Sequence, residues 1–230
     1  TPGEASAVAL DGGNIFIADG SRGFQIAQLD GGKVNGVGKI EAMDNARAIA
    51  ASGNYVYIAN GPNLVHVFDF SNPEEIKDKN AFHARGPVVD MAIWKDYLFL
   101  AEGGHGVQVL NIKDRPSPRE AQFGILESEA IYNARSIEIS STYNYLYVAD
   151  GEGGLKIYDI SELANVRQIK SFDAVEGGSV AHVSLMGDYI FFLDEGSGGR
   201  VIFSPSPVDF IEMDDDNMAD GLIEGEIHHL

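Results

Sequence analysis

The chain has 230 residues, with 35 acidic and 16 basic side chains, and its formal net charge is −19. A field of this sign repels phosphate backbones and anionic lipid headgroups, so nucleic acid is excluded as an expected partner. Cysteine is absent, which excludes disulfides, thiolate metal sites and a cysteine nucleophile, and no apolar run approaches the roughly 18 residues of a membrane span.

The first predicted unit, at about residues 5–45, sets a pattern of four short strands. The run "ASAVAL" alternates between apolar and other residues, and a glycine hairpin leads from it into "IFIADG". A glycine-rich turn then precedes "FQIAQLD", and the more polar "GVGKIEAM" follows. Alternation with a period of two predicts strands with one buried face. The polarity of the last segment predicts an exposed outer strand, because charged edges discourage pairing with other chains.

The same order recurs four more times along the chain. The second strands of these units read "YVYIANG", "YLFLAEG", "YLYVADG" and "YIFFLDEG". An acidic or amide residue closes each second strand, at Asp19, Asn60, Glu102, Asp150 and Asp194. The steps between these residues are 41, 42, 48 and 44 residues, a period that suits four strands. The later repeats are predicted at about residues 46–87, 88–133, 134–179 and 180–213.

Stacked repeats of this kind predict an all-β fold. A four-stranded antiparallel sheet cannot bury both of its faces alone, so such units pack face to face around a ring. We therefore predict a β-propeller of five blades over residues 1–213. Residues 214–230 form an acidic segment in which 219–223 and 227–230 can be aligned with the first two strands of a repeat. This segment is either a ring-closing or capping hairpin or the start of a sixth blade.

The repeat resembles a known family. The stretches "YVADGEGGLKIYDIS" and "YIANGPNLVHVFDFSNP" are similar to the LVIVD repeat, which is found in propeller proteins of bacterial and archaeal cell surfaces. Repeat 4 fits best and repeat 2 fits well, whereas "QLD", "NIK" and "SPS" replace the final "DIS" in repeats 1, 3 and 5. The resemblance implies an exported interaction module without a shared catalytic constellation.

The repeated polar residues are interpreted as structural. Asp and Asn side chains bond to nearby backbone in turns, so Asp19 and its four counterparts, as well as Asp69 and Asp159 at the ends of third strands, are assigned to turn geometry. The glycine turns are not phosphate loops, because a strand rather than a helix follows each of them. The six histidines show no helical zinc spacing, and "DDDNMADG" fails the pattern of a calcium loop. No metal site can therefore be assigned.

A candidate site lies at the axis, where the first strands of a propeller converge. The aligned positions there carry different residues in each repeat. The candidate ligand-binding or partner-binding residues are Ser6, Arg47, Asp90, Arg135 and His182. A binding site built from one position of each repeat would show different residues at these positions, and random divergence between the repeats would show the same.

Catalysis is not indicated, because the sequence lacks sialidase-type aspartate boxes, a GxSxG motif and a lactonase-like acidic cluster. We expect a non-enzymatic propeller that presents a rigid acidic surface to a protein partner or a larger surface assembly and needs no cofactor. Thr1 is interpreted as a processed or trimmed start, and an extracytoplasmic location is expected. The alternative is a small-ligand receptor or hydrolase-type enzyme with its site at the axis. A third interpretation makes the acidity an adaptation to high salt.

Overall fold

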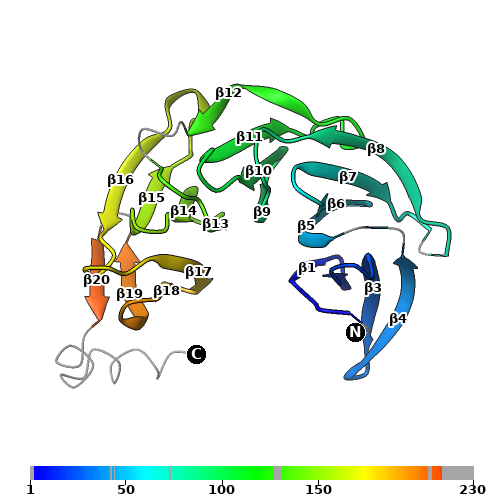
Figure 1. Cartoon of the computed structure of the whole chain (residues 1–230), viewed down its shortest axis with the longest axis horizontal. Coiled ribbons are helices and arrows are strands. Elements are labelled where there is room, and N and C mark those ends of the chain that lie inside the picture. The colour runs from blue at the N-terminus through cyan, green and yellow to red at the C-terminus, as the bar shows by residue number, and fades with distance from the viewer. Residues whose placement is uncertain are drawn as a thin grey trace.

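The computed structural model describes residues 3–213 except 42, 44, 73, 127–130 and 207–208. These residues form five four-stranded antiparallel sheets, each built from four consecutive strands (Figure 1). Within them the one helical element is a single 3-10 turn, Leu163–Asn165. The predicted all-β propeller fold with five blades is confirmed. The hairpin predicted within residues 214–230 lies outside the described residues.

Each blade runs from an inner strand at the centre of the molecule to an outer strand at its rim (Figure 1). Blade 1 consists of β1 (Ala7–Asp11), β2 (Asn14–Ala18), β3 (Phe24–Asp30) and β4 (Lys33–Ile40). Blade 2 consists of β5 (Ala46–Ser52), β6 (Tyr55–Asn60), β7 (Leu64–Asp69) and β8 (Lys77–His83). Blade 3 consists of β9 (Asp90–Trp94), β10 (Tyr97–Ala101), β11 (Val107–Asn111) and β12 (Arg119–Leu126). Blade 4 consists of β13 (Ser136–Ser140), β14 (Tyr145–Ala149), β15 (Leu155–Asp159) and β16 (Arg167–Phe172). Blade 5 consists of β17 (Val180–Met186), β18 (Tyr189–Asp194), β19 (Gly198–Ser206) and β20 (Asp209–Met213).

Glycines shape the turns that join these strands. In the turn between the second and third strands of blade 4, Gly154 has a φ of +81°, a conformation that residues with a side chain rarely adopt. A Cβ atom at Gly154 would lie 2.1 Å from the carbonyl oxygen of Phe172, so a side chain has no room there. The glycine of the repeat is thus required both by its backbone conformation and by the close approach of β16.

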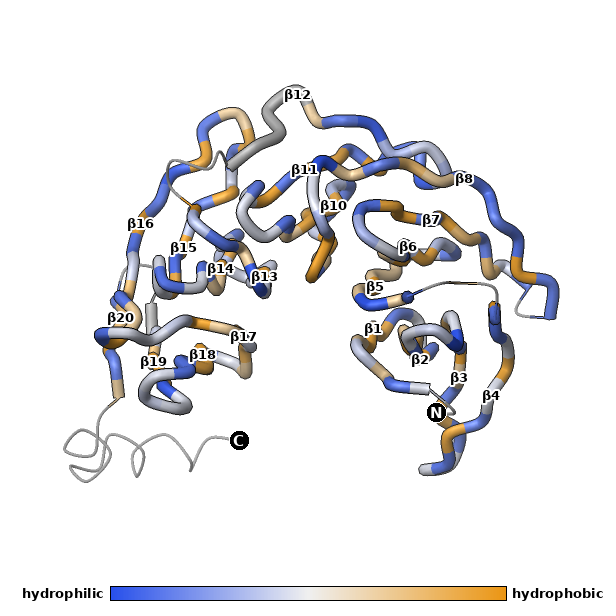
Figure 2. The backbone as a smooth tube through the Cα atoms, viewed as in Figure 1, coloured by the Kyte–Doolittle hydropathy of each residue, from blue (hydrophilic) through white to orange (hydrophobic). Residues whose placement is uncertain are grey.

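The core lies between neighbouring blades. We call the face of a blade that contacts the next blade its forward face and the opposite face its backward face. Phe16 and Ala18 on the forward face of blade 1 pack with Ile49, Val56 and Ile58 on the backward face of blade 2. Orange hydrophobic and blue hydrophilic segments are both present along the chain in Figure 2, but the second strands of blades 2, 3 and 4 are buried at nearly every residue, on both faces rather than on the one face that was predicted. Each blade between two others therefore buries both of its faces.

The five blades follow one another around a common centre but leave the ring open. The inner strands lie side by side in the order β1, β5, β9, β13 and β17. Figure 1 shows a wide gap between blade 5 and blade 1. The sequence left closure open between a ring-closing or capping hairpin and the start of a sixth blade, and the described residues form an open arc. The number of repeats does not fix closure, because the angle between blades is set by side-chain packing and known propellers have about 4–8 blades.

Candidate functional site

The predicted axial residues belong to two different positions of the inner strands. Cross-strand pairing places Asp90 opposite Ala101 and His182 opposite Leu193, and in blade 4 the residue at this position is Ser136, opposite Ala149. Ser6, Arg47 and Arg135 lie one residue earlier in the register. The aligned set of the sequence analysis therefore combined side chains of neighbouring positions, and this alignment is corrected by the structure.

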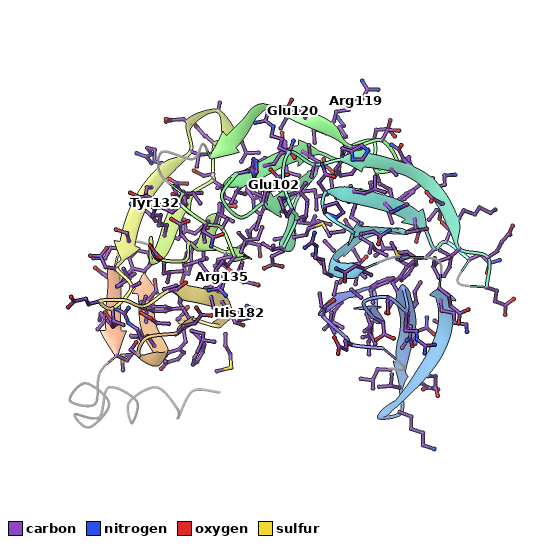
Figure 3. The ribbon with its side chains drawn as sticks, in the orientation of Figure 1. Glu102, Arg119, Glu120, Tyr132, Arg135 and His182 are labelled. Carbon is purple, nitrogen blue, oxygen red and sulfur yellow. The ribbon has the colours of Figure 1, made fainter. Side chains whose placement is uncertain are left out.

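Asp90, Ser136 and His182 form a polar row across three inner strands. The Oδ2 atom of Asp90 accepts a hydrogen bond of 2.9 Å from the backbone N–H of Ile137 in the next blade. The Ser136 hydroxyl also bonds to the Asp90 side chain and lies 3.1 Å from Nδ1 of His182. Sequence reasoning missed Ser136, and its position opposite the alanine of the second strand was the signal that could have found it. His182 lies on β17 at the side of blade 5 that faces the centre (Figure 3).

The polar row does not have the order of a catalytic triad. Catalysis by serine needs a histidine that accepts the hydroxyl proton and a carboxylate that orients the histidine. Here Ser136 lies between the other two, and its hydroxyl bonds to Asp90 directly. Asp90 thus contacts Ser136 instead of orienting His182 as a base, which is not the arrangement that activates a serine nucleophile.

Two carboxyl groups at the axis have raised pKa values. Burial raises the pKa of Asp90 above its ordinary value, although the N–H groups of Ile137 and Met91 act in the opposite direction. Burial also raises the pKa of Glu138 on β13, and the nearby charge of Asp90 adds to this effect. A raised carboxyl pKa means that the folded chain binds the proton more tightly than the unfolded chain does.

The pH dependence of stability should reveal this effect. The stabilising contribution of Asp90 is fully present below the ordinary carboxyl pKa and is lost as pH rises through the raised pKa. Wild-type melting temperatures minus those of Asp90→Asn should therefore fall with rising pH across that window. Thermal unfolding followed by circular dichroism from about pH 3.5 to about pH 7 tests this prediction. A difference that is flat or rises with pH would contradict it, and Glu138→Gln provides a comparison at the neighbouring group.

The other three predicted residues bond to backbone or to neighbouring blades. The Ser6 hydroxyl donates to the Ala46 carbonyl of blade 2 over 2.8 Å. The Arg47 guanidinium donates to the carbonyls of Gly61 and Pro62. These contacts hold the ends of the inner strands in place.

Arg135 links blade 4 to blade 5. Its guanidinium donates to both carboxylate oxygens of Glu195, over 2.9 and 3.0 Å, and to the Ser179 hydroxyl over 3.0 Å. The hydrogen bond and positive charge of Arg135 lower the pKa of Glu195. Arg135 is thus engaged in an interface between blades, in addition to its place near the axis (Figure 3).

The polar residue that closes each second strand holds the segment leading into its own blade. In all five blades its side chain accepts a backbone N–H from that segment, the donors being Gly3, Asn45, Arg85, Asn133 and Val175. A backbone role for this position is confirmed. These partners lie 15 to 19 residues away, and Asp194 also accepts the N–H of Gly196 within its own turn, over 3.0 Å. Asp69 and Asp159 do accept local bonds, from Ser71 and Ser161.

Two of these carboxylates also carry a cation from the third strand. The Lys156 ammonium lies 2.6 Å from Asp150, which has no exposed surface. The Arg200 guanidinium lies 3.3 Å from Asp194 in the same way. In blade 1 the corresponding residue is Gln25, whose amide donates to Asp19 over 2.7 Å. In these three blades the buried carboxylate is therefore bonded to a cation or an amide from the third strand.

Outer grooves are present on blades 3 and 4. The groove on blade 3 has a volume of about 600 Å³. It is lined by Tyr97, Asn111, Lys113, Asp114, Ser117, Arg119, Glu120 and Ala121. The groove on blade 4 is lined by Tyr132, Glu152, Gly153, Lys156, Ser171 and Asp173. Figure 3 shows Arg119, Glu120 and Tyr132 far from the axial His182. Sequence reasoning missed these grooves, because residues from several strands and turns line them together.

Two further features are absent from the described part of the chain. Its His, Asp and Glu side chains include no group of three or more that could hold a metal ion. No helix there has the length and apolar character needed to cross a bilayer.

The chain matches one family by sequence. Residues 2–27, 44–77 and 133–174 match the LVIVD repeat family, and these segments lie in blades 1, 2 and 4. The resemblance stated from the sequence is thus confirmed. No curated protein sequence matches the chain.

Solved structures with the same fold have little sequence in common with this chain. A protein from Lactobacillus plantarum is 13% identical, with a TM-score of 0.72 over 91% of this chain and 70% of that one. The Cps50 (Swd1) β-propeller domain of Myceliophteria thermophila is 16% identical, with a TM-score of 0.69 over 94% and 74%. A Bacteroides uniformis protein, provisionally named a 6-phosphogluconolactonase, is 14% identical, with a TM-score of 0.70 over 88% and 68%. At these identities the matches establish the β-propeller fold alone.

Proposed function

Because this chain is a β-propeller with LVIVD repeats in three of its blades, we propose that it is a non-enzymatic interaction module of a cell-surface or extracellular assembly. The observation that carries this proposal is the state of the axial polar residues. Ser136 bonds to both Asp90 and His182, and Asp90 also accepts the backbone N–H of Ile137. Ser6 and Arg135 bond to neighbouring blades. Polar side chains that are bonded in this way rigidify the propeller and do not form a set of catalytic groups.

The surface charge suggests the chemistry of the partner. A net charge of −19 on 230 residues creates a negative field around a rigid β framework. Such a field speeds association with a positively charged protein surface and disfavours acidic partners. The extracytoplasmic setting is supported by the resemblance to the LVIVD repeat, whose proteins are found at bacterial and archaeal cell surfaces.

Binding should therefore depend on salt and on exposed carboxylates. Glu74, Glu152 and Glu176 are exposed on three different loops. Replacing all three with lysine changes the charge by two at each site, from −19 to −13. We expect this variant to bind the native assembly at least about tenfold more weakly near 0.15 M salt, and the wild type to weaken similarly at about 0.5 M, because charge steering is screened over roughly 8 Å.

Native mass spectrometry and affinity measurements in a cell-envelope extract test this prediction. The matched control replaces the same residues with glutamine, which should give an intermediate loss. Free monomer alone at physiological salt would contradict the proposal, and so would binding that is insensitive to both salt and charge.

A small-ligand or hydrolase site at the axis is the weaker alternative. The polar row of Asp90, Ser136 and His182 is the feature that favours it, and one structure of similar fold is provisionally named a lactonase. The order of the row does not supply an activated nucleophile. The fold by itself supports many activities, so the similarity does not decide between them.

A further inference from the structure

Exposed apolar side chains gather on the two blade faces that border the gap. Eleven large hydrophobic side chains are exposed in the described residues, and eight of them lie on these two faces. The backward face of blade 1 carries Val8, Leu10, Leu29 and Val34. The forward face of blade 5 carries Met186, Phe191, Leu193 and Ile211. We call these the open face of blade 1 and the open face of blade 5.

The strand register shows that each set belongs to one face. In blade 1, Val8 pairs with Ile17 and Leu10 pairs with Ile15, so four apolar side chains point the same way. In blade 5, Met186 pairs with Tyr189, which in turn pairs with Phe203, and Phe203 pairs with Ile211. A contiguous apolar surface of this kind indicates an interface rather than ordinary scattered exposure.

The same positions are buried where a neighbouring blade is present. Phe191 is 36% exposed, whereas the residue at its position in blade 2, Tyr57, has no exposed surface. Leu193 is 47% exposed, and its counterpart Ala59 is 2% exposed. The open face of blade 5 is therefore a forward face that has the composition of a blade interface and lacks the contacts of one.

The size of similar folds suggests what the gap accommodates. The match to the Cps50 (Swd1) propeller domain covers 74% of that chain, and the match to the Lactobacillus plantarum protein covers 70%. If the five blades correspond to 70–74% of a complete propeller, a closed ring of the same curvature has about seven blades. The gap then has room for about two further four-stranded units.

The sequence after β20 carries the pattern of such a unit. Residues 216–230 can be laid without gaps against 44–58, which hold the linker, inner strand and hairpin of blade 2. Gly225 then corresponds to Gly53, the hairpin residue with a φ of +63°. Leu222, Ile223, Ile227 and Leu230 fall at strand positions of this alignment.

We propose that the open face of blade 5 is a blade-binding surface and that residues 216–230 supply the first strands of a sixth blade, which covers it. In each earlier blade the segment after the outer strand leads into the inner strand of the next blade, and the first strands of that blade cover the forward face. This inference is independent of the proposed function, because no partner takes part in it.

Cysteine labelling tests the proposal, since the chain has no cysteine of its own. Leu193→Cys places one thiol on the open face of blade 5, and Leu10→Cys places the matched control on the open face of blade 1. Each is made in the full chain and in a chain ending at Met213, and reaction with N-ethylmaleimide is timed under native conditions. We expect Leu193→Cys to react at least about tenfold more slowly in the full chain. Leu10→Cys should react at the same rate in both chains.

A second variant keeps the full length. In the full chain, Ile223→Asp with Leu230→Asp should restore fast labelling of Leu193→Cys. These two positions align with Ala51 and Ile58 on the backward face of blade 2, and charged residues there would not pack against the open face of blade 5. Equal rates for Leu193→Cys in all three chains would overturn the proposal. Protection of both thiols that grows with protein concentration would also overturn it, and would assign the open faces to a second copy of the chain.

Discussion

Replacing Ile58 with alanine is expected to lower the free energy of unfolding by about 2–5 kcal/mol. Ile58 has no exposed surface and packs between blades 1 and 2, beside Phe16 and Phe24. Removing three carbon atoms from this interface loses burial and leaves a cavity, because β-sheets stacked on both sides cannot collapse to fill it. Urea unfolding of wild type and variant, fitted with a common slope, measures the change.

The chain contains a matched control for this prediction. Ile17 occupies the same position as Ile58 in the second strand, with the same residue type, but it lies on the open face of blade 1 and is partly exposed. Ile17→Ala should lose less than half as much stability, because the side chain has no blade against it. Equal losses at the two positions would show that blade 1 is covered on both faces in solution, which contradicts an open arc of five blades.

The strands and blades could be predicted from the sequence because local chemistry determines them. The alternation in "YLYVADG" specifies a strand, and Gly154 is the residue type that its turn requires. Closure could not be predicted, because an open face and a covered face have the same composition. Ile15 and Ile17 border the gap, whereas Val56 and Ile58 at the same positions are buried.

The axial site was harder to predict than the fold because side-chain direction depends on strand register. Irregular pairing at the start of β5, between Ala46 and Ala48, and at the start of β17, between Val180 and His182, shifts the inner strands against their partners. Such a shift moves a side chain to the other face of the sheet. The pairing of β9 and β13 is regular, so the combination of Arg135 with Asp90 has a different cause: the sequence letters were aligned one residue out of register, which passed over Ser136. Contacts across blades, such as that of Arg135 with Glu195, depend on the tertiary structure and leave no local pattern.

The charge pairs of the turns provide the second large effect. Lys156→Met is expected to lower the free energy of unfolding by about 3–5 kcal/mol, because it leaves the Asp150 carboxylate buried without its cation. Methionine keeps the length and the apolar stem of lysine, so lost packing contributes little. The measurement is again urea unfolding at neutral pH, where the unpaired carboxylate is most costly.

A second substitution should rescue this variant. Blade 2 has an amide at the position of Asp150, and the side-chain oxygen of Asn60 accepts the N–H of Asn45 over 2.9 Å, just as Asp150 accepts that of Asn133 over 2.7 Å. Adding Asp150→Asn to Lys156→Met therefore removes the buried charge and keeps the bond to the incoming segment. The double variant should regain most of the lost stability, and the single Asp150→Asn should be less stable than the wild type. A double variant as unstable as Lys156→Met alone would mean that packing of the lysine stem, and not the buried charge, stabilises this turn.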